Sequence, residues 1–204
     1  MDGFSSLAGR LLIAMPGIDD DRFRQAVILV CAHGPDHAMG VRIDQPLVGI
    51  DLSTVLEKLD LPPPTQGYEA PVLAGGPVER ERGFVLHTDD WISDGTSLAF
   101  GDGLALTGTR DVLIAMSDPV TGPRRSRLML GYAGWDEGQL EAELTENIWL
   151  TAEADTDMVF DDDHDTAASD NTFPPASFTV VPTVMVSPTD DKVIVPGDSS
   201  MVDG

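Results

Sequence analysis

Short apolar runs rich in β-branched residues dominate the first part of the chain. Arg10–Met15 (RLLIAM) and Ala26–His33 (AVILVCAH) are continuous apolar segments, which is typical of strands buried on both faces. Ala38–Asp44 (AMGVRID) follows the turn HGPDH, and two runs joined by a short Gly-Pro turn predict a β-hairpin. Between the first two runs, the sequence DDDRF predicts a short helical turn with an aspartate cap.

Three later segments have the apolar spacing that is typical of an α-helix. Asp51–Asp60 places leucine and valine side chains on one face, and an aspartate or serine can cap its start. A second helix is predicted after Thr109 (RDVLIAMSD), and a third over Asp136–Asn147. The remaining strand candidates are Pro71–Val78, Arg82–Thr88, 96–100 (TSLAF), 104–108 (LALTG), Ser126–Gly134 and a last strand that begins near Asn147.

Strands and helices alternate only loosely along the chain, without a strict βαβ period. At least two of the connections are short enough for hairpins, which join antiparallel strands. The sequence therefore predicts an α/β fold with a mixed, partly antiparallel sheet flanked by helices, and not an all-parallel doubly wound sheet.

The composition of the chain changes after Phe160. Residues 161–171 (DDDHDTAASDN) are acidic and small, and the rest is rich in Pro, Val, Ser and Thr. Prolines at 174, 175, 182, 188 and 196 exclude a continuous helix there. We therefore expect one domain over residues 1–160 and a poorly ordered tail over residues 161–204.

The formal net charge of the 204-residue chain is −23. Residues 1–150 carry 23 acids and 11 bases, whereas residues 151–204 carry 12 acids and one lysine. Nucleic acid is an unfavourable partner for such a chain, because affinity for it depends on Lys and Arg at the phosphates. The nearest approach to a basic patch is Arg124, Arg125 and Arg127, which we interpret as a solvated strand edge.

The N-terminal segment and the single cysteine favour a cytoplasmic protein. The first residues carry Asp2 and no basic start, and the apolar run LLIAM is too short for a signal peptide. The chain contains no run of about 18 apolar residues, so the sequence predicts no membrane span. Cys31 lies inside an apolar run, so a buried core thiol is the favoured interpretation. A nucleophile assisted by His33, two residues further on the same strand face, is the alternative.

Motifs for nucleotide, hydrolase and metal chemistry are missing. The chain has no GxxxxGK[ST], GxGxxG, GxSxG, CxxC or HExxH pattern. Asp161–Asp163, His164 and Asp165 form an acidic cluster without the spacing of a calcium loop, so we interpret it as solvated. We expect neither a cofactor nor a metal.

Histidines and glycines at predicted strand ends are the remaining candidates for a site. His33 and His87 each end a strand, where sheets often place site residues, although a hydrogen-bonded structural histidine is the favoured interpretation of both. Gly75 and Gly76 lie where the backbone must turn tightly or approach something closely. Tight packing and a small-ligand site both remain open for these glycines.

Three ordered blocks of the chain resemble the bacterial YqgE/AlgH family. The first is LAGRLLIAMPGIDDDRFRQAVILVCAHGPDHAMGVRIDQP, the second is APVLAGGPVERERGFVLHT, and the third is LMLGYAGWDEGQLEAELTENIWLTAEAD. Together they cover about Leu7 to Phe160. The resemblance implies a partly barrel-like mixed sheet with flanking helices and implies no established activity. One branch of the family has been called a transcriptional regulator, without a recognisable DNA-binding motif.

The chain departs from the family pattern at two places. Family members usually have Asn where this chain has Asp44, and an apolar residue where it has Arg42. A charged Asp44 beside the turn at Pro46 is expected to alter any site there. Members also usually finish with a short helix carrying Trp and Leu, and the residues after about Asp165 show no such pattern.

Three classes of function remain open. The first is a non-enzymatic binding or regulatory protein that acts through an unknown small molecule or protein partner. The second is an enzyme that uses His33, His87 or Glu141 as a proton carrier, which convergence of two of these side chains would favour. The third, disfavoured by charge, is a transcriptional regulator. The candidate pocket comprises Met15, Pro16, His33, Gly75, Gly76, His87, Trp135, Gln139 and Glu141.

Overall fold

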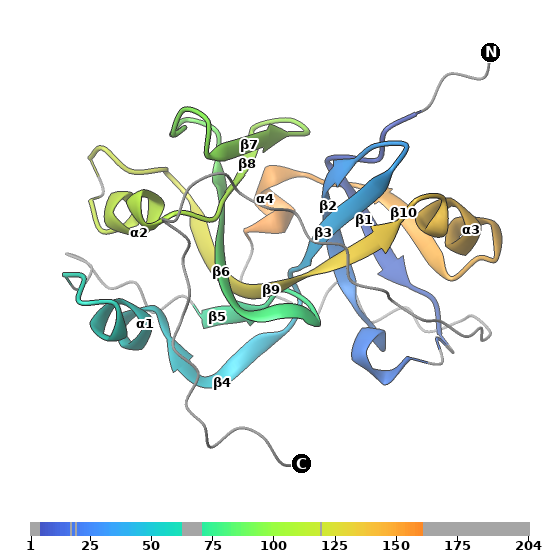
Figure 1. Cartoon of the computed structure of the whole chain (residues 1–204), viewed down its shortest axis with the longest axis horizontal. Coiled ribbons are helices and arrows are strands. Elements are labelled where there is room, and N and C mark those ends of the chain that lie inside the picture. Colours follow the sequence, from blue (N-terminus) through green and yellow to red (C-terminus); the bar gives the residue numbers. More distant parts are fainter. Residues whose placement is uncertain (1–4, 17, 19, 63–70, 119, 161–204) are drawn as a thin grey trace.

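The computed structural model describes residues 5–16, 18, 20–62, 71–118 and 120–160. The predicted tail, with its acidic cluster, lies outside these residues. In the described ranges, ten strands form one sheet and the helices lie around it (Figure 1). The elements are β1 (Arg10–Ala14), η1 (Asp21–Phe23), β2 (Val27–His33), β3 (His37–Arg42), β4 (Pro46–Asp51), α1 (Leu52–Lys58), β5 (Pro71–Ala74), β6 (Val78–Thr88), β7 (Ser97–Phe100), β8 (Leu104–Thr107), α2 (Arg110–Met116), β9 (Ser126–Asp136), α3 (Gln139–Thr145), β10 (Trp149–Glu153) and α4 (Thr156–Val159).

The long strand β9 organises the sheet. It pairs antiparallel with β3 and β6 and parallel with β5. The main order is β10-β1-β2-β3-β9-β6-β8-β7, and β4 joins through β5. One parallel contact among antiparallel ones confirms the predicted mixed sheet.

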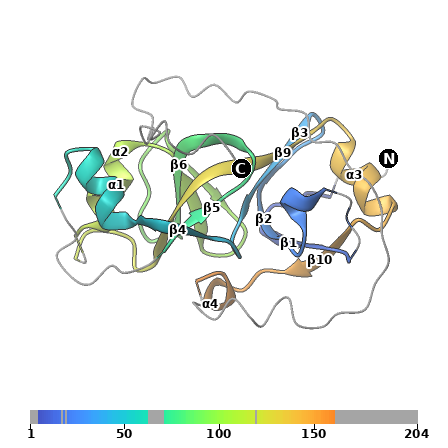
Figure 2. The ribbon, with the colours of Figure 1, turned by 90° about the horizontal axis from the view of Figure 1, so that it is seen from below.

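The sheet curls, so its central strands are buried on both faces, whereas β4, β7 and β10 keep exposed residues. Met129 packs in the cluster on the inner side of the curl, whereas its neighbours Leu128 and Leu130 pack with α1 and α2 on the outer side. A third cluster packs the outer faces of β1, β2 and β9 against η1 and α3. Both views place α1 and α2 at one end of the molecule and α3 at the other (Figures 1 and 2). Burial on both faces explains why the strand sequences are continuous apolar runs.

Most local predictions are confirmed, with several differences. The predicted strand Pro71–Val78 ends at Ala74 while Val78 begins β6, and helix α4 was not predicted. Helix α1 begins where predicted, and the Asp51 side chain accepts a hydrogen bond from Thr54 N at 2.7 Å. Helix α3 begins later than predicted, because β9 continues to Asp136 and Gly138 turns with φ +70° before the helix. Strand β4 was not predicted, since Pro46 suggested a strand end, but a proline is tolerated at the first residue of an edge strand. None of the described helices is long and apolar enough to cross a membrane.

The two departures from the family pattern contact each other at the end of β3. Arg42 Nη2 lies 2.7 Å from Asp44 Oδ2, and both side chains are largely buried. Arg42 Nη1 also donates to the Arg22 carbonyl at 2.7 Å, while Asp44 Oδ1 accepts from Val27 N at 2.9 Å. The ion pair therefore fastens the segment around η1 to the first residue of β2.

Removing one partner of this pair is expected to destabilise the fold. Asp44→Ala leaves the Arg42 guanidinium without its carboxylate in a largely buried place, so the free energy of unfolding should fall by about 2–4 kcal/mol. Arg42→Leu with Asp44→Asn, the combination that the family pattern suggests, should recover more than half of that loss. Urea unfolding followed by circular dichroism measures both values.

The exposed pair Arg24–Asp21 provides the control. Asp21→Ala should change the free energy of unfolding by less than about 1 kcal/mol. A loss of the same size for Asp21→Ala and Asp44→Ala would contradict a special role for the buried pair.

Candidate functional site

Helix α3 gathers several of the residues that the sequence singled out. Glu141 on α3 contacts His33 at the end of β2, and Gln139 lies one turn from Glu143, which contacts Trp135 of β9. Met15 and Pro16 follow β1, and Met15 N donates to the Ile148 carbonyl just before β10 at 3.0 Å. These residues come from four parts of the sequence that the sheet brings to one end.

The His33 side chain is held in one tautomer by its neighbours. Its Nδ1 accepts a hydrogen bond from Leu7 N at 2.9 Å, so the proton of the neutral ring lies on Nε2. Nε2 lies 2.8 Å from Glu141 Oε1 and donates to it. The His33 side chain is 2% exposed and the Glu141 side chain 48%, so Glu141 is the member of the pair that solvent reaches.

Glu143 is a buried carboxylate that the sequence analysis missed. It is 4% exposed, and its Oε2 accepts from the indole N–H groups of Trp135 at 2.6 Å and Trp149 at 2.8 Å. Gln139 Nε2 donates to Oε1 at 2.8 Å. A signal was present in the sequence, because an acid three residues after Leu140 lies on the apolar face of the helix.

Burial has the largest effect on the pKa of Glu143. The loss of solvation raises the pKa of its carboxyl to about 7, against the opposing effect of the three N–H donors. Each donor suits the ionised form, but a carboxyl oxygen has two lone pairs, so Oε1 can take a proton and still accept from Gln139. A pKa of about 7 places the proton equilibrium of Glu143 close to neutral pH, beside two tryptophans.

His87 lies away from α3, on β6. Both of its nitrogens are satisfied: Nδ1 donates to the Thr88 carbonyl at 2.9 Å, and Nε2 accepts from Thr107 Oγ1 at 2.9 Å. Thr107 Oγ1 in turn lies 2.7 Å from Ser97 Oγ. His87 is fully buried, and burial lowers its pKa, which keeps the ring neutral. The structure therefore does not bring His87 together with His33 and Glu141.

Gly75 and Gly76 also lie away from α3, against the backbone of β9. A Cβ atom at Gly75 would lie 2.3 Å from the Gly131 carbonyl oxygen, and one at Gly76 would lie 2.1 Å from the Tyr132 carbonyl carbon. The two glycines thus serve a close approach of backbone to backbone. The space beside them is filled by β9.

Cys31 lies in the core cluster inside the curl and is 1% exposed. Burial raises the pKa of its thiol, and Sγ donates a hydrogen bond to the Leu29 carbonyl at 3.5 Å. His33 directs its ring nitrogens to Leu7 and Glu141. Across the described ranges, no three His, Cys, Asp or Glu side chains are grouped as metal ligands.

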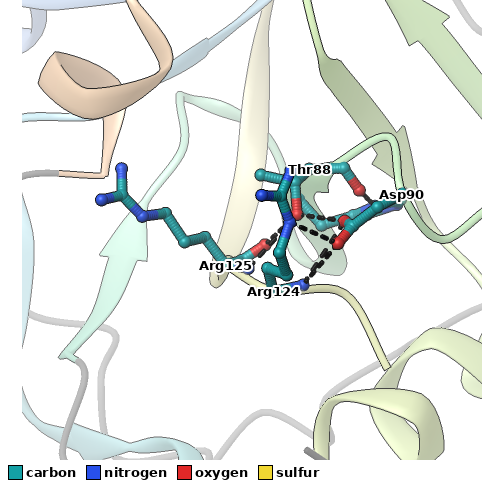
Figure 3. Close-up of polar contacts among 5 residues, drawn as sticks. Thr88, Asp90, Arg124 and Arg125 are labelled. Atoms are coloured by element: carbon teal, nitrogen blue, oxygen red, sulfur yellow. Dashed lines mark hydrogen bonds and ion pairs between the residues drawn. The ribbon is translucent and has the colours of Figure 1, made fainter. Parts of the chain in front are cut away.

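The cations at the start of β9 are each engaged by the protein. Figure 3 shows Arg124 beside Asp90, with Nε 2.8 Å from Oδ2, while the Arg125 side chain points away from Asp90. Arg125 Nη1 donates to Asp157 at 2.6 Å, and Arg127 donates to the Phe160 carbonyl at 2.8 Å. These three cations therefore tie the start of β9 to the loop after β6 and to α4.

The titration of Glu143 makes the stability of the protein depend on pH. A carboxyl whose pKa rises from 4.5 in the unfolded chain to about 7 in the fold stabilises the fold fully below pH 4.5. That stabilisation is lost as the pH rises through about 7. The free energy of unfolding should therefore fall over this range in the wild type, relative to Glu143→Gln. Tryptophan emission should titrate with a midpoint near pH 7 in the wild type and not in Glu143→Gln.

Glu137→Gln, on the exposed turn before α3, is the matched control and should keep the wild-type titration. The assignment fails if the emission of Glu143→Gln still titrates near pH 7. A flat wild-type curve would contradict it as well.

Comparison with curated proteins shows relatives that carry the family name UPF0301. A UPF0301 protein of Caulobacter vibrioides is 51% identical over 159 residues, which cover 78% of this chain and 82% of the relative. A UPF0301 protein of Ruegeria pomeroyi is 50% identical over 155 residues, covering 76% of this chain and 83% of the relative.

Solved structures with the same fold are also known. The solution structure of the AlgH protein from Pseudomonas aeruginosa matches with a TM-score of 0.65 and 42% identity, covering 79% of this chain and 85% of that chain. A crystal structure of a Corynebacterium diphtheriae protein, DIP2367, matches with a TM-score of 0.60 at 22% identity and supports the fold alone; it covers 78% of this chain and 82% of that chain. A family model described as AlgH-like matches residues 11–170. The resemblance inferred from the three sequence blocks is thus confirmed, and the chain belongs to the AlgH-like family.

Proposed function

We propose that this chain is a non-enzymatic binding or regulatory protein, and that the α3 end of the sheet is its binding region. The observation that carries the proposal is that the buried polar side chains there already have hydrogen-bond partners within the protein. Both ring nitrogens of His33 and both carboxylate oxygens of Glu143 are occupied by partners in the protein. Groups held in this way position a surface, whereas a general base keeps one atom for its substrate.

The enzyme alternative retains one specific observation in its favour. His33 and Glu141 converge at 2.8 Å, as the proton-carrier hypothesis requires of two of its members. The third member, His87, is buried on β6 with both nitrogens bonded. The Ser6 hydroxyl beside His33 donates to the His33 carbonyl oxygen at 3.1 Å and not to the ring, so it is not prepared as a nucleophile.

The cytoplasm is the proposed compartment, supported by the free thiol of Cys31 in the core. Direct control of transcription is less well supported than binding of a small molecule or protein. Arg124 and Arg125 each form an ion pair with an aspartate, which reduces the positive charge they offer to phosphates.

Stoichiometric capture and turnover can be separated in one experiment. The full chain is incubated with a bacterial metabolite extract, and both the extract and the desalted protein are followed by mass spectrometry. A binding protein retains a species in an amount no greater than its own and leaves the extract otherwise unchanged. Glu141→Gln should reduce the retained amount, because Glu141 is the solvent-accessible carboxylate of the region.

His37→Gln, at the start of β3, is the control and should retain the same amount as the wild type. The proposal is replaced by the enzyme alternative if a species is consumed in large molar excess over the protein and His33→Gln abolishes that consumption.

A further inference from the structure

Strand β10 forms an edge of the sheet. Its only partner among the described strands is β1, and the register runs from Arg10 opposite Glu153 to Ala14 opposite Trp149 without a shift. In Figure 2 β10 lies at the border of the ribbon, between α3 and α4. The sequence WLTAE contains no lysine or proline, the residues that commonly protect such an edge.

The outward-facing backbone groups of β10 follow from its register. Met15 N donates to the Ile148 carbonyl, so Ile148 faces β1. In an antiparallel pair the direction of the backbone groups alternates, which also turns Leu150 and Ala152 toward β1. The N–H and C=O groups of Trp149, Thr151 and Glu153 therefore point away from the sheet.

The other ends of the sheet are less suited to pairing with a further strand. Beyond β7, the backbone of Gly101 lies against Gly9, where an added Cβ atom would be 2.6 Å from the Gly101 Cα. Strand β4 starts with Pro46 and has an irregular register with β5. Among these strands, β10 thus has the most regular free row of hydrogen-bonding groups.

The elements around this edge carry an excess of negative charge. Residues 128–160, which form most of β9 together with α3, β10 and α4, contain eight acids and no lysine or arginine. Arg10 of β1 lies 3.5 Å from Glu153, whose side chain is still 88% exposed. Leu150 adds an apolar side chain that is 51% exposed.

We propose that the free edge of β10 binds an extended, lysine- or arginine-rich segment of a partner protein by adding it to the sheet as a further strand. Backbone groups of Trp149, Thr151 and Glu153 would pair with the segment, Leu150 would contact its apolar residues, and the acidic flank would attract its cations. This inference rests on the proposed binding function and gives it a class of partner.

Charge separates this occupant from the two nearest alternatives. A second copy of the chain would bring another acidic flank against Glu153, at a net charge of −23 per chain. The chain's own residues 161–204 contain nine acids and one lysine, so they offer this acidic flank almost no cations. A cationic segment is the occupant that this surface attracts.

Binding is tested with the full chain and a capped peptide of alternating valine and lysine, about ten residues long. A matched peptide has glutamate in place of each lysine. Hydrogen exchange by nuclear magnetic resonance should show new protection at the amides of Trp149, Thr151 and Glu153 with the lysine peptide. The amides of Leu150 and Ala152 already face β1 and should change little. The affinity should fall as salt rises from about 50 to 300 mM.

Thr151→Pro removes one outward N–H without touching the pairs with β1 and should weaken peptide binding at least about tenfold. Thr151→Val keeps that N–H and should bind like the wild type. The exchange pattern of the wild type provides the same information without a variant, should Thr151→Pro unfold.

Each of the following results would overturn the proposal: no binding of the lysine peptide at low salt, equal binding of the glutamate peptide, protection away from β10, or full binding by folded Thr151→Pro. Protection of the β10 amides in the free protein also overturns the proposal. If that protection grows with protein concentration, the occupant of the edge is a second copy of the chain. If the protection does not depend on concentration, the occupant is the chain's own tail. Stoichiometric capture of a metabolite without peptide binding removes this inference alone. Turnover that requires His33 removes the proposed function alone.

Discussion

The fold depends on one strand that has no free side. Every residue of β9 from Ser126 to Trp135 is buried. Its edges pair with β3, β5 and β6, and its two faces supply separate clusters of core side chains. Such a strand cannot shift its register without exposing one core and breaking the other. The close approach of Gly75 and Gly76 to its backbone has the same cause, since side chains there would hold β9 away from β5.

Helix α3 is held in place through contacts with β9 and β10. Trp135, near the end of β9, and Trp149, at the start of β10, pack edge to face with ring centroids 6.1 Å apart and direct both indole N–H groups at Glu143. A buried carboxylate costs free energy, which these donors and Gln139 offset in part. The remaining cost is what raises the pKa of Glu143. The contacts that hold α3 against the sheet thus include a carboxyl whose pKa lies near 7.

The predictable part of the structure is the part set by neighbours in the chain. Apolar runs and helix caps predicted most strands and helices, because burial on both faces and an Asp51 cap leave a local pattern. Pairing between distant segments, such as the parallel contact of β5 with β9, leaves no local pattern in the sequence. For the site, His33 and Glu141 were both candidates, but their contact joins residues 108 positions apart. Glu143 was missed because its partners, except Gln139, lie on other elements, although its place on an apolar helix face was visible.

The topology links the α3 region to the open edge of the sheet. Strands β9 and β10 follow each other in sequence, yet β3, β2 and β1 lie between them in the sheet. The connection must therefore cross the outer faces of these strands, and α3 buries Leu140 against the cluster that covers them. That crossing ends beyond β1, where β10 has β1 as its one partner among the described strands. One crossover thus covers a face of the sheet with the acidic helix α3 and places the edge strand β10 next to it. The negative charge of α3 and the outward-facing backbone groups of β10 therefore both result from this crossover.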